Sequence, residues 1–116
     1  MIQKLPASSA ESHESEETMV HTAERFDELT REWKEKKRFL SSVSQIAMLP
    51  SYQQIIGMGS VALPFIFREL QNEPDHWFWA LASITGENPV PPDQRGRIGL
   101  MTQAWLNWGR SKGYLN

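Results

Sequence analysis

The side chain best suited to proton transfer in this chain is His76, which follows Glu73 and Asp75. A histidine beside carboxylates can act as a general acid or base. No nucleophile accompanies it, because Ser60 lacks the G-x-S-x-G pattern that presents a catalytic serine. The HExxH spacing of a zinc site is also absent. We therefore expect a protein that is not an enzyme and that holds no metal or other cofactor, and an enzyme centred on His76 ranks third.

The five tryptophans in 116 residues are the second unusual feature. Trp77 and Trp79 lie two residues apart, about 200° around a helix, so both cannot face one core. Tryptophan is enriched at binding hot spots, and whichever of the two points outward is a candidate contact for a partner. The alternative for the set is that a thin helical domain uses large side chains to close its core.

We predict a partner-binding surface around the second of these tryptophans and the loop after its helix. An exposed aromatic ring beside rigid proline and fixed charge can dock with little loss of entropy. The predicted surface comprises Trp79, His76, Asp75, Glu87, Asn88 and Pro89. The partner is another protein, and the chain would serve as an adaptor, an antitoxin-like inhibitor or a regulatory subunit. A homo-oligomer formed through an exposed apolar helix face is also open.

The basic run KEKKR, over residues 34–38, supports an alternative hypothesis, a regulator that binds nucleic acid. Its phosphate contacts would be Arg31, Lys34, Lys37 and Arg38. A second basic group would add Arg95, Arg97, Arg110 and Lys112. Such binding weakens steeply as salt rises. A pI of about 5.9 and the glutamates within the run favour the simpler interpretation of a solvated helix face.

An amphipathic helix over residues 18–40 is the clearest element, because its apolar residues recur on a narrow stripe. Acidic residues come early and lysines late, which complements the helix dipole. A serine-rich stretch and Pro50 then favour a loop with at most one helical turn near residues 45–49. Ser51 is the expected N-cap of the next short helix, which ends where Gly57 and Gly59 turn the chain.

Three further helices are expected after this turn. Ser60 is the predicted cap of a largely apolar helix over residues 61–71, with Pro64 in its first turn. A helix that starts near Pro74 or Asp75 stops at Gly86, and the proline-rich loop that follows acts as a spacer. Asp93 is the predicted cap of a last helix that ends near Gly113.

The predicted fold class is all-α, a compact bundle of four or five helices, because no segment alternates with period two for long enough to form a strand. The string GSVALPFIFREL resembles the second half of a HEAT repeat, which implies irregular helical pairs in the C-terminal two-thirds.

Length and composition indicate one domain with an N-terminal tail. At 116 residues folding buries roughly 65% of the surface of the unfolded chain, which suffices for one core. Residues 1–17 carry one lysine and four glutamates among serines, so we expect a disordered tail there and a single helical domain over residues 18–116. The sequence lacks cysteine, a signal peptide and a spanning apolar stretch, so we expect a cytoplasmic protein without membrane partners.

Three segments, SYQQIIGMG, PDHWFWALASITGENPVPP and AWLNWGRSKGY, together resemble a family of short, uncharacterised bacterial proteins that is well represented in cyanobacteria. The resemblance covers roughly residues 22–115. It implies a bacterial cytoplasmic protein and carries no catalytic residue over to this sequence.

Overall fold

A computed structural model describes the backbone from Lys4 to Asn116 and the side chains from Glu16 onward. Every element within residues 4–116 is helical, which confirms the all-α bundle. The elements are, in chain order, α1 (Lys4–Lys37), α2 (Val43–Ala47), α3 (Pro50–Met58), the 3₁₀ turn η1 (Gly59–Ala62), α4 (Leu63–Asn72), α5 (Phe78–Thr85), the 3₁₀ turn η2 (Pro92–Gln94) and α6 (Ile98–Ser111). The predicted HEAT-like pairing stays a prediction.

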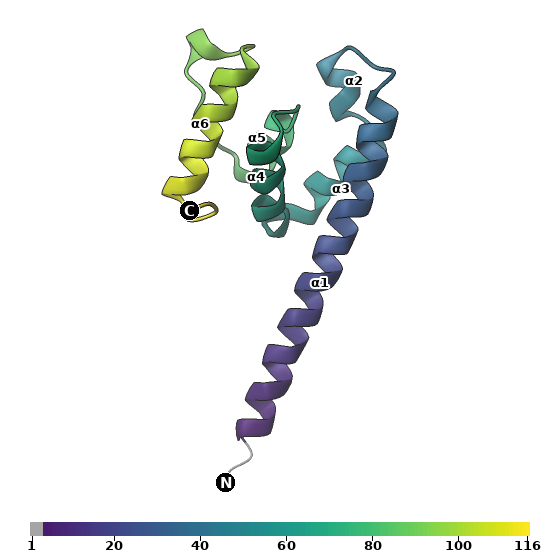
Figure 1. The fold of residues 1–116 in the computed structure, drawn as a ribbon, viewed down its shortest axis with the longest axis vertical. Helices are drawn as coiled ribbons and strands as arrows, with labels where there is room; N and C mark the ends of the chain where they lie inside the picture. Colours follow the sequence, from purple (N-terminus) through teal and green to yellow (C-terminus); the bar gives the residue numbers. More distant parts are fainter. Residues whose placement is uncertain (1–3) are drawn as a thin grey trace.

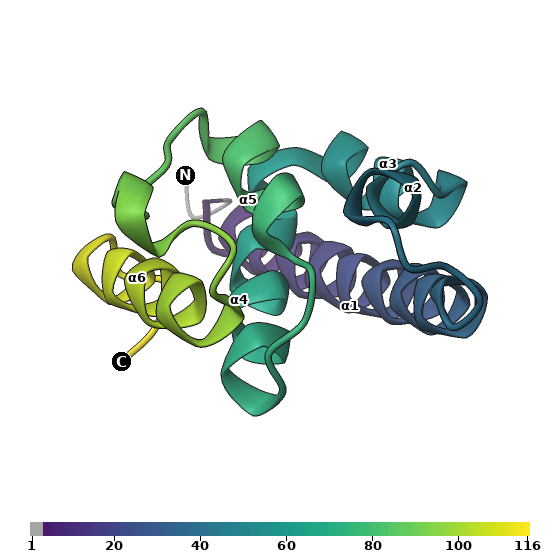
Figure 2. The ribbon, with the colours of Figure 1, turned by 90° about the horizontal axis from the view of Figure 1, so that it is seen from above.

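The helices form a globule from which the first part of α1 projects as an arm (Figure 1). Seen from above, α4 and α5 lie between α1 on one side and α6 on the other (Figure 2). The molecule measures 61 × 30 × 23 Å, and the arm accounts for its long dimension.

The helix α1 begins at Lys4, which differs from the start near Thr18 that the sequence predicted. Pro6 falls in its first turn, where the missing N–H is tolerated, and no proline or glycine then interrupts the chain before Pro50. Nothing in the local sequence stops the helix over the predicted tail. Residues 1–3 of that tail lie outside the described residues.

The predicted helix caps are wrong, because prolines and 3₁₀ turns shift the boundaries. Helix α3 starts with Pro50 at its first position, so Leu49 rather than Ser51 is the cap residue. Pro64 does fall in the first turn of α4, as predicted, but no side chain caps that helix, so Ser60 has no capping role. Asp93 lies within η2, and Arg97 precedes α6.

Two of the predicted stops are confirmed by their backbone conformation. Gly59, with φ of 75°, follows α3, and Gly86, with φ of 72°, follows α5. Both angles lie in the left-handed region that glycine adopts without strain. Gly57, by contrast, is inside α3 and is not a turn residue.

The centre of the core is an aromatic cluster that joins α1, α3 and the start of α5. The rings of Trp33, Tyr52 and Trp77 are fully buried, with centroids 4.6–6.2 Å apart. The Nε1–H of Trp33 donates to the carbonyl of Ile46 at 3.1 Å, which also ties α2 to α1. Such ring pairs contribute about 0.5–1.5 kcal/mol each beyond the burial of their area.

The Tyr52 hydroxyl connects α3 to the start of α5 through two hydrogen bonds. It donates to the carbonyl of His76 at 2.9 Å and accepts from the N–H of Ala80 at 2.8 Å. Ala80 is one of the first residues of α5, whose N–H groups have no partner within the helix. The hydroxyl therefore caps α5 from a distant part of the chain.

A second aromatic cluster joins α4 to α6. Phe67, Trp108 and Tyr114 stack with centroids 5.6–6.1 Å apart. Gly109 allows the two helices to approach, because a Cβ there would lie 2.9 Å from the ring of Phe67. This packing sets the position of α6 against the rest of the globule.

The change Gly109→Ala is expected to destabilise the protein by about 1–2 kcal/mol. Overpacking costs about 1–3 kcal/mol, and the helix propensity of alanine offsets up to about 1 kcal/mol of it. The matched control is Gly99→Ala in the same helix, where a Cβ meets nothing within 4 Å and stability stays level or rises. Urea unfolding followed by circular dichroism measures both, and equal behaviour of the two variants would contradict the close approach.

The change Tyr52→Phe is expected to lower the free energy of unfolding by about 1–3 kcal/mol at neutral pH, because the N–H of Ala80 loses its partner. Burial also raises the pKa of Tyr52 well above its ordinary value of 10.0, although the bond from Ala80 lowers it in part. Above pH 10.0 the unfolded chain releases the tyrosine proton, whereas the folded chain keeps it. Stability therefore falls with rising pH, by up to about 1.4 kcal/mol per unit.

The check is urea unfolding of both proteins at a series of pH values from neutral to strongly alkaline. The wild-type protein should lose stability more steeply than the Tyr52→Phe variant above pH 10.0. Parallel pH profiles would show that the hydroxyl is not held neutral in the fold.

Candidate functional site

An apolar groove lies between α2, α5 and the start of α6. Its volume is about 400 Å³, which is within the range of ligand and peptide sites. The groove is lined by Val43, His76, Phe78, Trp79, Ala82, Asn88, Gly96, Ile98, Met101 and Trp105. Most of these side chains are hydrocarbon or aromatic, and the polar groups stand at two positions only, His76 and Asn88.

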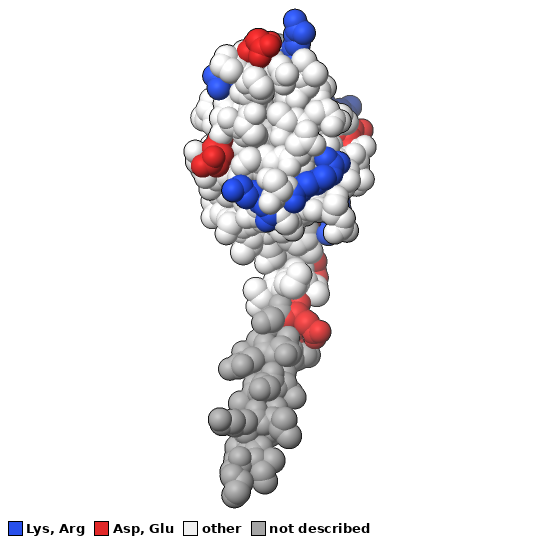
Figure 3. Space-filling view, turned by 90° about the vertical axis from the view of Figure 1, so that its left-hand side faces the viewer, with Lys and Arg blue, Asp and Glu red and all other residues white. Residues whose placement is uncertain are grey.

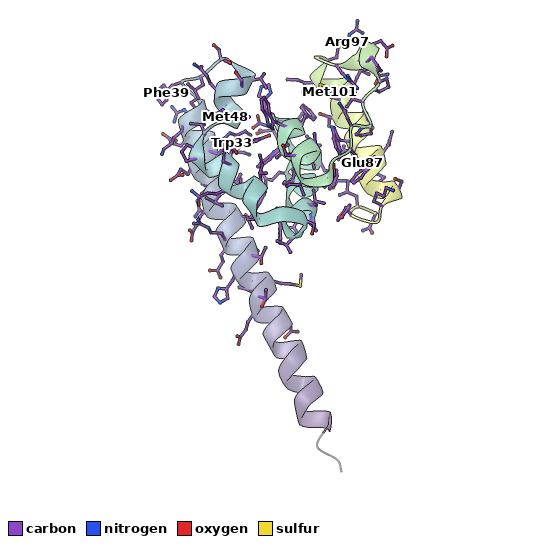
Figure 4. The ribbon with its side chains drawn as sticks, turned by 180° about the vertical axis from the view of Figure 1, so that it is seen from behind. Trp33, Phe39, Met48, Glu87, Arg97 and Met101 are labelled. Atoms are coloured by element: carbon purple, nitrogen blue, oxygen red, sulfur yellow. The ribbon has the colours of Figure 1, made fainter. Side chains whose placement is uncertain are left out.

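Exposed apolar side chains gather at this end of the globule. Three of them line the groove itself: Val43 (50% exposed), Trp79 (42%) and Ile98 (40%). Phe39, which is 80% exposed, lies at the outer edge where α1 gives way to α2, and Met101 lies on α6 across from it (Figure 4). Large apolar side chains that remain in water around a concave surface are typical of a binding site.

The opposite orientations of Trp77 and Trp79 confirm the expectation that only one of the pair can face the core. Trp77 is fully buried in the central aromatic cluster, and Trp79 opens onto the groove. Because Trp77 directly precedes α5, its burial sets the rotation of that helix. The outward position of Trp79 is a consequence of that rotation.

His76 lines the groove with its backbone held at both ends. Its N–H donates to Oδ1 of Asp75 at 2.7 Å, and its carbonyl accepts from Tyr52. Asn88, on the loop after α5, also lines the groove, and its Oδ1 accepts from the N–H of Val90 at 3.2 Å. These polar residues are therefore positioned before any partner arrives.

The structure separates the other predicted contact residues from the groove. The Asp75 carboxylate is only 11% exposed and is paired with Nζ of Lys37 at 3.3 Å, so it serves the fold. Pro89 lines a wider, more polar hollow of about 550 Å³ along α6, and Glu87 lines another hollow near Lys112. The structure thus brings together three of the six predicted residues, Trp79, His76 and Asn88.

Sequence reasoning missed the wall of the groove that α6 supplies. Ile98, Met101 and Trp105 follow one another at helical spacing, and this pattern indicates a core-facing stripe. All three line the groove, but only Trp105 is fully buried, while Ile98 and Met101 stay accessible because α6 extends beyond the helix it packs against. No local signal distinguishes the two situations.

The basic residues predicted to contact nucleic acid from α1 are mostly engaged within the chain. Lys34 lies 3.1 Å from Glu69, Lys37 pairs with Asp75, and Arg38 lies 3.1 Å from its neighbour Glu35. Of the four predicted contacts, Arg31 alone has no ion pair among the residues from Glu16 onward. The pairs of Lys34 and Lys37 hold α1 to α4 and to the segment before α5.

Comparison of the chain with protein-family models, with curated proteins and with solved structures finds no match. In the part of the chain whose side chains are described, no three His, Asp or Glu residues converge as a metal site would require. No helix in the described residues has the length and apolar character needed to cross a bilayer.

The change Asp75→Asn is expected to lower the free energy of unfolding by about 1 kcal/mol, because it removes the charge that pairs with Lys37 and leaves the amide oxygen to accept from His76. For a domain of this size that corresponds to a fall in Tm of about 5 °C. Asp93→Asn is the control, an exposed acidic residue that has no ion pair among the side chains described from Glu16 onward. Equal melting temperatures for the two variants would contradict a structural role for Asp75.

Proposed function

We propose that this chain is a protein–protein interaction module that binds an apolar segment of a partner protein in the groove between α2, α5 and α6. The observation that carries the proposal is the concave apolar surface itself, with Val43, Trp79 and Ile98 left exposed around it. Burying apolar area stabilises a complex by roughly 25 cal/mol per Å², so these side chains favour association with a surface of the same kind.

The walls of the groove come from rigid elements, which favours tight binding. Trp79 stands on a helix whose rotation is set by Trp77, and the N–H of Ala80 at its start is bound by Tyr52. Asn88 is held in a local turn by Val90. A preorganised surface loses less conformational entropy on binding than a mobile one.

The chemistry of the groove indicates the chemistry of its partner segment. Two or three large apolar side chains on one face of a partner helix would contact Trp79, Ile98 and Met101. The polar side chains of His76 and Asn88 would form hydrogen bonds with backbone or amide groups of the partner. A chain that binds such a segment can act as an adaptor, an antitoxin-like inhibitor or a regulatory subunit, and the groove does not favour one of these roles.

The change Trp79→Ala is expected to weaken partner binding at least about thirtyfold, the effect of removing a hot spot worth about 2 kcal/mol. The measurement is affinity purification of the tagged full chain from its own cells, in lysate treated with nuclease. The control is Val61→Ala in η1, a side chain that is 56% exposed and does not line the groove. The proposal is supported if a protein is recovered in stoichiometric amounts with the wild type and with the control, and is lost with Trp79→Ala.

Circular dichroism and melting temperature must show that Trp79→Ala still folds, which its exposure favours. A second variant, Ile98→Asp, places a charge on the opposite wall of the groove. Partner recovery that survives both substitutions in folded protein would reject the groove as the binding site. If the recovered protein is a second copy of this chain, light scattering of the purified protein should show a dimer that both variants dissociate.

A further inference from the structure

Three of the cations that are outside ion pairs lie away from the basic run of α1, on α4 and at the end of α6. Arg68 on α4, together with Arg110 and Lys112 at the end of α6, has no acidic partner within 4.0 Å among the residues from Glu16 onward. Lysine and arginine side chains form a band across the lower part of the globule on the face that α6 presents, with no acidic side chain between them (Figure 3).

An aromatic ring stands between two of these cations. Tyr114 is the shared wall of two adjoining hollows, one of about 260 Å³ lined also by Arg68 and one of about 340 Å³ lined also by Lys112. The ring is held by stacking on Trp108, with centroids 6.1 Å apart and planes 13° apart. Each hollow therefore offers a cation beside a fixed aromatic wall.

The two cations are themselves positioned by aromatic rings. The guanidinium of Arg68 lies over the ring of Phe65 at 5.5 Å, and Nζ of Lys112 lies over the ring of Trp108 at 5.8 Å. Gln71 and Asn116 add amide groups to the first hollow, where polar surface predominates. Each hollow thus combines one cation with the ring of Tyr114.

We infer that this surface binds single-stranded nucleic acid, with two successive bases in the two hollows that share Tyr114 and their phosphates at Arg68 and Lys112. Arg110, exposed in the last turn of α6 and hydrogen-bonded to Asn107, supplies a third phosphate contact along the strand. The combination of cations with an aromatic wall is the pattern by which proteins bind unpaired strands without reading their sequence.

The paired hollows favour a single strand over the other polyanions. A duplex keeps its bases stacked inside, so it offers phosphates to the cations and nothing to the hollows. An acidic polypeptide offers carboxylates but no flat rings. Glu87 also lines the second hollow and repels any anion there, so it limits affinity at that position. The binding is independent of the apolar groove, which has its own lining residues apart from this surface.

The test is fluorescence anisotropy of the purified full chain with a labelled single-stranded DNA of about 12 nucleotides, the length that such surfaces cover. The plot of log affinity against log salt should have a slope of about −2, since each phosphate contact to a single strand contributes about −0.7. The double variant Arg68→Gln with Lys112→Gln should lose roughly tenfold in affinity for each cation at about 50 mM salt. The Glu87→Gln variant should bind more tightly than the wild type.

The matched control is Arg31→Gln with Arg97→Gln, which changes the net charge equally at two exposed cations that do not line these hollows. An equal loss of affinity in this control would overturn the assignment, because binding would then follow net charge alone. A duplex of the same DNA sequence, and polyglutamate of matched length, should bind at least several-fold more weakly than the single strand. Equal binding of either, or no binding of the single strand at low salt, would overturn it as well.

Discussion

The packing of Trp33, Tyr52 and Trp77 is the interaction on which the rest of the structure depends. These rings belong to α1, α3 and the residue before α5, so they join segments that are far apart in the sequence. The Tyr52 hydroxyl then binds both the carbonyl of His76 and the first turn of α5. The ring packing and these two hydrogen bonds set the direction and the rotation of α5, which lines the apolar groove.

Ion pairing within the globule explains how a nearly neutral domain can present two different surfaces. Lys34 and Lys37, late in α1, form ion pairs with Glu69 and Asp75, so part of the charge of the basic run is neutralised where α1 meets the rest of the fold. Among the cations without such partners from Glu16 onward, Arg68, Arg110 and Lys112 lie on α4 and at the end of α6, and Arg68 and Lys112 line the hollows beside Tyr114. The apolar groove and the two hollows beside Tyr114 share no lining residue.

The errors in the predicted helix caps arise because the helices begin at other residues than the local patterns indicate. Ser51, Ser60 and Asp93 each suit an N-cap by residue type, but Ser51 lies inside α3, Ser60 lies inside η1 and Asp93 lies inside η2. Proline is favoured at the first position of a helix, so α3 begins at Pro50 and Leu49 takes the cap position. The distant Tyr52 hydroxyl takes that role for α5, and no pattern of neighbouring residues could indicate it.

The sequence by itself determined the all-α class, the stops at Gly59 and Gly86 and the opposition of Trp77 and Trp79, because each follows from helix periodicity or from the backbone freedom of glycine. Only the tertiary structure decided which tryptophan is buried, that Ile98 and Met101 reach a groove, and that Lys37 is joined to Asp75. These outcomes depend on contacts between residues far apart in the chain, whose energies a local pattern does not contain.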